Sequence, residues 1–151
     1  MYNHHDKNLL LLIEKWVFLV SKKLKDYFSV AFFAFFGGAL RCYFNLLWSV
    51  YGTFIANIIG SFVLALITYF FIEYKHVSQW LKTGLTTGLV GAFTTFSTFQ
   101  LDTLKLLQSN YWFNGCLYFI LSIILGFTFA YLGMQVGKNW GKKVGKKICS
   151  K

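Results

Sequence analysis

Long uncharged runs alternate with short clusters of lysine along this chain. Four apolar runs are present, at residues 27–40, 53–72, 83–101 and 111–137. A helix needs roughly 20 residues to cross a bilayer. The first run is short for a span, so we expect its helix to continue past Arg41 towards Leu47. The pattern predicts an all-α integral membrane protein with four transmembrane helices.

The third run differs from the others because its centre is rich in hydroxyl groups. Its 19 residues include eight Thr, Ser or Gln side chains: Thr83, Thr86, Thr87, Thr94, Thr95, Ser97, Thr98 and Gln100. Residues 91–99 read Gly-Ala-Phe-Thr-Thr-Phe-Ser-Thr-Phe, which makes a poor helix interior. Backbone that is not helical at membrane depth persists only where protein or a water-filled path satisfies it. We therefore expect this third helix to be interrupted mid-membrane and to line an ion path.

One strongly polar side chain, Asn57, lies within the second run. It shares a helix face with Thr53 and Ser61, each four residues away. A buried amide without a partner costs roughly 4–8 kcal/mol on a hydrocarbon reference scale. Asn57 must therefore bond to another helix or face water or an ion, and both interpretations stay open here. The one arginine, Arg41, has two interpretations of equal weight. Its side chain either reaches the headgroups or acts as an anion-attracting charge at a pore mouth.

Composition and charge point to a membrane surface. Of the 151 residues only 13% are charged, whereas a soluble domain has about a quarter. The net charge is +10, and 14 of the 15 basic residues are lysines that cluster beside the apolar runs, with no nucleic-acid recognition motif. Four spans put 13 basic residues on one side and 2 on the other. The positive-inside rule then places both termini in the cytoplasm, in a multi-pass protein of the plasma membrane.

The two ends of the chain flank a four-span domain at residues 27–137. Residues 1–26 contain an apolar stretch with Trp16 and Val20 at helical spacing, and no small-residue cleavage site follows. An amphipathic helix in the membrane interface is favoured over a signal peptide. Residues 138–151 form a lysine-rich tail with a glycine at every fourth position of its repeat, and we expect this tail to rest on anionic lipid.

Other chemistry has little support. The three cysteines, Cys42, Cys116 and Cys149, have neither a disulfide framework nor a zinc spacing. Ser97 has no His, Lys or Asp partner at membrane depth, so we predict that the protein is not an enzyme.

The motifs around Asn57 and in residues 91–99 resemble those of the Fluc (CrcB-type) fluoride channels. The first reads Gly-Thr-Phe-Ile-Ala-Asn-Ile-Ile-Gly-Ser-Phe at residues 52–62. Gly-Gly-Ala-Leu-Arg at residues 37–41 is similar to the end of that family's first span, and Tyr118 and Ser122 match positions on its fourth. The resemblance covers roughly residues 34–137.

The resemblance implies a four-helix subunit that works as an antiparallel, dual-topology-type dimer and lets fluoride leave the cell passively. It implies that an ion path is lined by Asn57, by the ring edges of Phe96 and Phe99, and by the hydroxyls of Ser97, Thr98, Tyr118 and Ser122. It also implies that backbone carbonyls of Gly91 and Thr94, at the helix break, hold a central structural Na⁺ that both subunits share.

Elementary chemistry agrees with a fluoride path. Fluoride is strongly hydrated, so a pore must replace its water with donors such as the Asn57 amide and hydroxyl groups. Aromatic rings are electron-poor at the edge, so Phe96 and Phe99 can face an anion edge-on with weak attraction. Weak sites suit conduction, because an ion that binds must also leave.

Three features depart from the family pattern. Ala92 stands where a second glycine is common, and an extra methyl could strain a tight break. Asp102 stands where a glutamate is usual. The dimer partner is either a second copy of this chain or an oppositely inserted homologue. The lysine bias indicates a fixed orientation, which favours the separate homologue.

Two other functions compete with a fluoride channel. A four-span multidrug exporter needs an acid in the membrane, and the candidates, Glu73 and Asp102, both lie at the ends of apolar runs. A membrane scaffold without transport activity needs only the small-residue stripes, but it leaves the hydroxyl-rich run unexplained.

Overall fold

The computed structural model describes the backbone of residues 4–108 and 112–149, with side chains for residues 13–108 and 112–147. The described residues are helical, without a strand. Their elements are α1 (His4–Trp48), α2 (Val50–Glu73), α3 (Gln79–Thr83), the π-helical η1 (Gly84–Val90), α4 (Gly91–Phe93), α5 (Phe96–Gln108) and α6 (Trp112–Cys149). The prediction of an all-α protein is confirmed.

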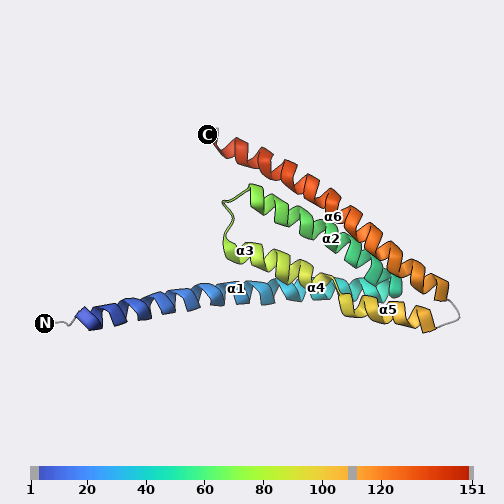
Figure 1. Cartoon of the computed structure of the whole chain (residues 1–151), viewed down its shortest axis with the longest axis horizontal. Helices are drawn as coiled ribbons and strands as arrows, with labels where there is room; N and C mark the ends of the chain where they lie inside the picture. The colour runs from blue at the N-terminus through green and yellow to red at the C-terminus, as the bar shows by residue number, and fades with distance from the viewer. Residues whose placement is uncertain (1–3, 109–111, 150–151) are drawn as a thin grey trace.

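The helices run back and forth along one axis (Figure 1). A single residue, Ser49, joins α1 to α2, and its positive φ of 49° reverses the chain. Both described ends of the chain and the loop of residues 74–78 lie at one end of the molecule, and the junction between α1 and α2 lies at the other (Figure 1). α2 packs mainly against α6, while α1 packs mainly against η1.

Glycines set the distance between the packed helices. A Cβ added to Gly133 would meet the carbonyl of Phe62, and one added to Gly137 would meet the carbonyl of Leu66. On α1, a Cβ at Gly37 would meet the carbonyl of Leu89. Lipid is as apolar as the side chains, so close backbone packing is what holds membrane helices together.

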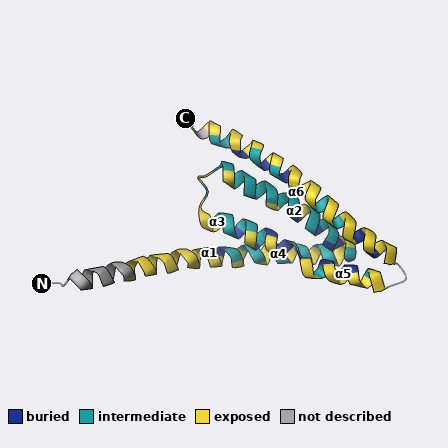
Figure 2. Cartoon of the chain, viewed as in Figure 1, coloured by how far each residue is buried: buried dark blue, intermediate teal, exposed yellow. Residues whose placement is uncertain are grey.

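Among the residues that the structure describes, three helices are long and apolar enough to cross a membrane: α1, α2 and α6. Many large apolar residues of α1 and α6 are exposed, as expected for a lipid-facing surface, whereas most of α2 is half-buried (Figure 2). The segment from Gln79 to Gln108 is not among these three, because it is divided into shorter helices. The chain is therefore an integral membrane protein.

α1 and α6 are longer than a bilayer requires. α1 has 45 residues and α6 has 38, which correspond to about 68 and 57 Å at 1.5 Å per residue. A hydrocarbon core is about 30 Å thick. The segment predicted to lie in the interface continues into the first span without a break, although the side chains of Leu9 and Leu12 lie outside the described ones. α6 likewise continues through the lysine-rich tail as far as Cys149.

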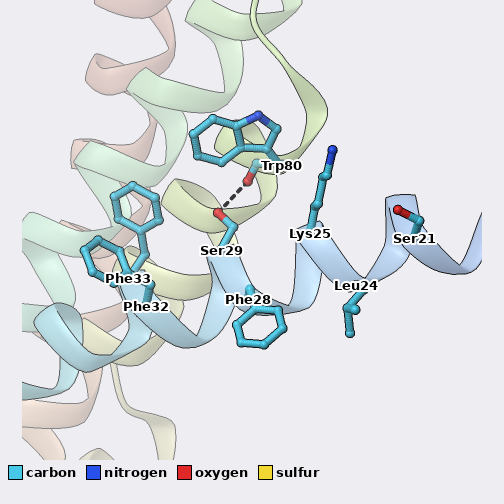
Figure 3. Close-up of a pocket in the computed structure, with 8 residues that line it drawn as sticks. All are labelled: Ser21, Leu24, Lys25, Phe28, Ser29, Phe32, Phe33 and Trp80. Carbon is cyan, nitrogen blue, oxygen red and sulfur yellow. Dashed lines mark hydrogen bonds between the residues drawn. The ribbon is translucent and has the colours of Figure 1, made fainter.

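α3 is anchored where α1 leaves the bundle. The Ser29 hydroxyl donates a hydrogen bond of 2.7 Å to the Trp80 carbonyl, and Lys25 extends on the same side of α1 as Trp80 (Figure 3). A mostly apolar cavity of about 720 Å³ lies between the two helices. Its lining residues are Ser21, Leu24, Lys25, Phe28, Ser29, Phe32, Phe33 and Trp80.

Candidate functional site

The helical segment after η1 is interrupted at Thr94 and Thr95. α4 ends at Phe93, whose ring is buried and meets the Phe44 ring of α1 edge-on at 5.6 Å. Thr94 is extended, with φ −81° and ψ 153°, and α5 begins at Phe96. The packing of Phe93 thus keeps the chain helical up to the break.

Asn57 of α2 holds the break through two hydrogen bonds. Its Nδ2 donates to the Thr95 carbonyl at 3.0 Å, and the Thr95 N–H donates to its Oδ1 at 2.9 Å. The side-chain amide therefore pairs with both backbone groups of one residue, the N–H and the carbonyl of Thr95. Of the two interpretations left open by the sequence, bonding to another helix is observed. An amide has two N–H donors, and this pairing uses one of them.

Thr95 also begins α5. Its Oγ1 accepts a hydrogen bond of 3.3 Å from the Thr98 N–H, which is the arrangement of a threonine at a helix N-cap. The same hydroxyl donates to the Thr98 Oγ1 at 3.1 Å and lies 3.3 Å from the Ser97 Oγ. Thr95 was not singled out from the sequence as a helix start, although a threonine directly before an apolar residue, here Phe96, is an N-cap signal.

The break lies after Gly91, which is itself helical with φ −62° and ψ −35°. Ala92 lies within α4 and is not among the residues with positive φ, so its methyl group meets no backbone penalty here. The tight contact at the break is instead made by Gly60 of α2, where an added Cβ would meet the Thr94 methyl group. Gly60 is therefore the residue whose small size the break requires.

Two backbone carbonyls near the break lose their usual donors. In a continuous helix the Gly91 carbonyl would accept from the Thr95 N–H, and the Thr94 carbonyl would accept from the Thr98 N–H. The Thr95 N–H donates to Asn57, and the Thr98 N–H donates to the Thr95 hydroxyl. Unwound carbonyls of this kind coordinate Na⁺ in broken membrane helices. The residues present therefore fit a cation.

A cavity of about 300 Å³ lies beside the break. Its lining comes from α2 and from the residues at the break: Asn57, Gly60, Ser61, Leu64, Thr94, Thr95 and Phe96. The Ser61 hydroxyl donates to its own helix at the Ile58 carbonyl, 2.8 Å away. The cavity thus brings together two of the predicted ion-path residues, Asn57 and Phe96, with Thr94.

Two other predicted path residues, Phe99 and Tyr118, belong to an aromatic cluster. Phe99 is 7% exposed and stacks on Tyr118 at 5.5 Å and on Phe119 at 5.7 Å between ring centroids. The Phe96 ring lies 6.1 Å from Phe99 but is 72% exposed. The two phenylalanines are therefore neighbours with very different environments.

Ser122 and Arg41 do not line the cavity at the break. The Ser122 hydroxyl donates to the Tyr118 carbonyl, one turn earlier in α6, at 2.7 Å. Arg41 is half-buried on α1 and does not line the cavity at the break. Its two interpretations therefore remain open.

Asp102 is a buried carboxylate that the sequence interpretation placed only at the end of a run. It is 6% exposed on α5, and its Oδ2 has no hydrogen-bond partner among the described residues. The Tyr118 hydroxyl, also buried and without a partner there, lies within electrostatic reach. The burial depends on how α5 packs against α6, which periodicity alone does not reveal.

The fold and the site define an all-helical membrane protein with a cavity at a break between two short helices. The family model described as "CrcB-like protein, Camphor Resistance (CrcB)" matches residues 28–134. The chain belongs to this family, which is a family of ion channels, and it is therefore not an enzyme.

Curated relatives carry a more specific name. The chain is 59% identical over 120 residues to the fluoride-specific ion channel FluC 1 of Lactobacillus johnsonii, covering 80% of this chain and 93% of the relative. It is 53% identical over 115 residues to FluC 1 of Lactobacillus delbrueckii subsp. bulgaricus, covering 76% and 90%. It is 46% identical over 115 residues to FluC 2 of Ligilactobacillus salivarius, covering 76% and 87%.

Proposed function

We propose that this protein is a fluoride-selective channel that lets fluoride leave the cell passively and so lowers cytoplasmic fluoride. The observation that carries the proposal is the cavity at the break, where the Asn57 amide, threonine hydroxyls and the exposed Phe96 ring converge. These are the neutral donors and ring edges that can replace the water around a small anion. The names of the relatives support the choice of fluoride.

We propose that the segment Gln79–Gln108 is a fourth span, interrupted within the membrane at Thr94 and Thr95. Its first part, from α3 to α4, packs against α1, and its last part, α5, packs against α6 (Figure 1). Its broken backbone is satisfied by Asn57 and by Thr95 itself. Such breaks are tolerated at membrane depth only where protein or a cavity satisfies them. The ion path would extend from Asn57 and Phe96 past Ser97 and Thr98 towards Phe99, Tyr118 and Ser122.

The exposed Phe96 ring favours a dimer. A cavity open on one side of the subunit and a large ring beside it suit completion by a second subunit. We propose an antiparallel dimer, in which the carbonyls of Gly91 and Thr94 would hold a structural Na⁺ between subunits. When bound, the ion would fix the backbone of the break and neutralise converging carbonyl dipoles.

The lysine bias favours cytoplasmic termini in the plasma membrane and a partner inserted in the opposite direction. Labelling of a cysteine introduced at Lys143 tests the orientation. Protection from a membrane-impermeant thiol reagent outside intact cells is expected. Conducting dimers of the chain alone, with tails reachable from both sides, would rule out a separate partner and leave self-pairing.

Fluoride efflux from liposomes that contain the purified protein tests the function. A fluoride gradient alone should drive efflux, and dissipating a proton gradient should not change its rate. Absence of fluoride efflux, both from this chain alone and together with an oppositely inserted homologue, would overturn the proposal.

The buried Asp102 is the one observation that favours a multidrug exporter, because such carriers exchange protons through an acid in the membrane. Proton-coupled transport of an organic cation by the same liposomes, without fluoride efflux, would support that alternative.

A further inference from the structure

At the end of α2 that is formed by Glu73, α6 continues past the membrane-spanning part of the bundle. The lysine-rich tail has glycines at 137, 141 and 145, four residues apart, so they share one face of α6. A Cβ at Gly141 would meet the Phe70 carbonyl at 3.0 Å and the Glu73 side chain at 2.7 Å. The glycine face therefore keeps the tail helix against the end of α2.

This packing places two lysines over the loop that follows α2. Lys142 and Lys146 come directly after Gly141 and Gly145, and they too are four residues apart. Together with the loop they enclose a cavity of about 310 Å³. Its lining residues are Glu73, Tyr74, Lys75, His76, Lys142, Gly145 and Lys146.

The cavity has an excess of positive charge. Three lysines and a histidine face one glutamate, and none of these lysines forms an ion pair within 4 Å with a carboxylate that the structure describes. Like charges around one cavity repel one another, so an anion from outside the chain would stabilise the arrangement.

The surroundings place this cavity at headgroup level. It begins where the apolar helix α2 ends, at Glu73. The Lys138 ammonium lies 4.9 Å from the centre of the Tyr69 ring, and the Trp140 ring lies 5.3 Å from the Phe70 ring. Aromatic and lysine side chains of this kind gather at the boundary between lipid and water.

We propose that this cavity binds the phosphate of an anionic phospholipid, through Lys75, Lys142 and Lys146. A basic pocket between the cytoplasmic ends of membrane helices suits a lipid headgroup, because the acyl chains stay beside the apolar helices. Lys142 and Lys146 lie beyond residues 28–134, where the family model matches. The site thus adds a lipid-specific contact to the channel proposed above without using any residue of the ion path.

The lysine repeat supplies its own matched control. Lys143 and Lys147 lie on the same helix and are equally exposed, but they do not line the cavity. The variants K142Q/K146Q and K143Q/K147Q therefore remove the same charge from the same turns. Native mass spectrometry of the full chain in detergent, titrated with phosphatidylglycerol or phosphatidylcholine, measures how many lipids each variant retains and how tightly.

The wild-type protein should retain one phosphatidylglycerol in preference to phosphatidylcholine. K142Q/K146Q should weaken that binding roughly 25-fold, since each lysine near an anionic headgroup contributes about fivefold. K143Q/K147Q should weaken it less than about threefold. K75Q tests the loop independently and should weaken binding about fivefold. Circular dichroism confirms that each variant retains its helices.

Two results would overturn the proposal. Equal weakening by the two double variants would show that diffuse tail charge, and not the cavity, attracts lipid. Full displacement of phosphatidylglycerol by an equal concentration of glycerol phosphate would show that the site takes a soluble phosphate and not a lipid.

Discussion

The two faces of α2 are built in opposite ways. Towards the break, α2 supplies the small residue Gly60, and Asn57 pairs with the Thr95 backbone. Towards α6, α2 supplies the bulky residues Phe62 and Leu66, and α6 supplies the glycines. One face is held by hydrogen bonds between a side chain and the backbone, the other by close contact between backbones. Damage to the first should remove transport, and damage to the second should remove stability.

The largest effect is expected from Asn57→Asp. The carboxylate cannot donate to the Thr95 carbonyl, and it puts a negative charge beside the anion path. Two like charges about 4 Å apart repel each other by roughly 4 kcal/mol near a protein surface, so fluoride flux should fall at least roughly 100-fold. Asn45→Asp is the matched control, because Asn45 accepts from the Thr53 hydroxyl away from the cavity and an aspartate can still accept. Unchanged flux in Asn57→Asp would remove this residue from the path.

The second test separates the two phenylalanines of the site. Phe99→Ala should lower stability by about 3–5 kcal/mol, because the ring is buried between aromatic neighbours. Phe96→Ala should change the stability of the subunit by less than about 0.5 kcal/mol, because its ring is exposed, yet it should reduce fluoride flux. Thermal unfolding in detergent and flux in liposomes measure the two effects. Full flux in a folded Phe96→Ala protein would contradict its role.

A variant at the contact between α2 and α6 should lose stability. Gly133→Val brings a side chain against the Phe62 carbonyl and should destabilise the protein by about 1–3 kcal/mol or more. Gly126→Val is the control on the same helix, since an added Cβ at Gly126 meets nothing within 4 Å. Equal melting temperatures of the two variants would show that the packing of α2 against α6 does not depend on close backbone contact.

The smallest effect is expected at the helix start. Thr95→Ala removes the hydroxyl that accepts from the Thr98 N–H and should cost about 1 kcal/mol. Thr95→Ser keeps the oxygen and should restore most of the stability. A serine variant as unstable as the alanine variant would mean that the methyl group, and not the cap, matters.

The sequence predicted where the helix breaks and that Asn57 needs a partner, but not that the two meet. A hydroxyl-rich run after Gly91 indicated where a helix would fail, and an amide within a span indicated a need for a partner. That Thr95 is this partner depends on the packing of α2 against a segment 38 residues away. Gly91 was expected at the break because glycine favours helix ends, but the packed Phe93 carries the helix past it.

The ends of the long helices were less predictable. Charged residues suggested that the interfacial segment and the lysine tail were separate from the spans, whereas α1 and α6 are continuous. Glycines in the tail repeat do not end α6, because they pack against α2. Asp102 looked like the boundary of a run because it is charged, and only the contact between α5 and α6 buries it.

The most direct measurement is the release of fluoride and chloride from the same liposomes, followed with two ion-selective electrodes. If the protein is a fluoride-selective channel, the wild-type protein, alone or with its oppositely inserted partner, releases fluoride while chloride stays inside. Release of both ions at similar rates, or of neither, would contradict it.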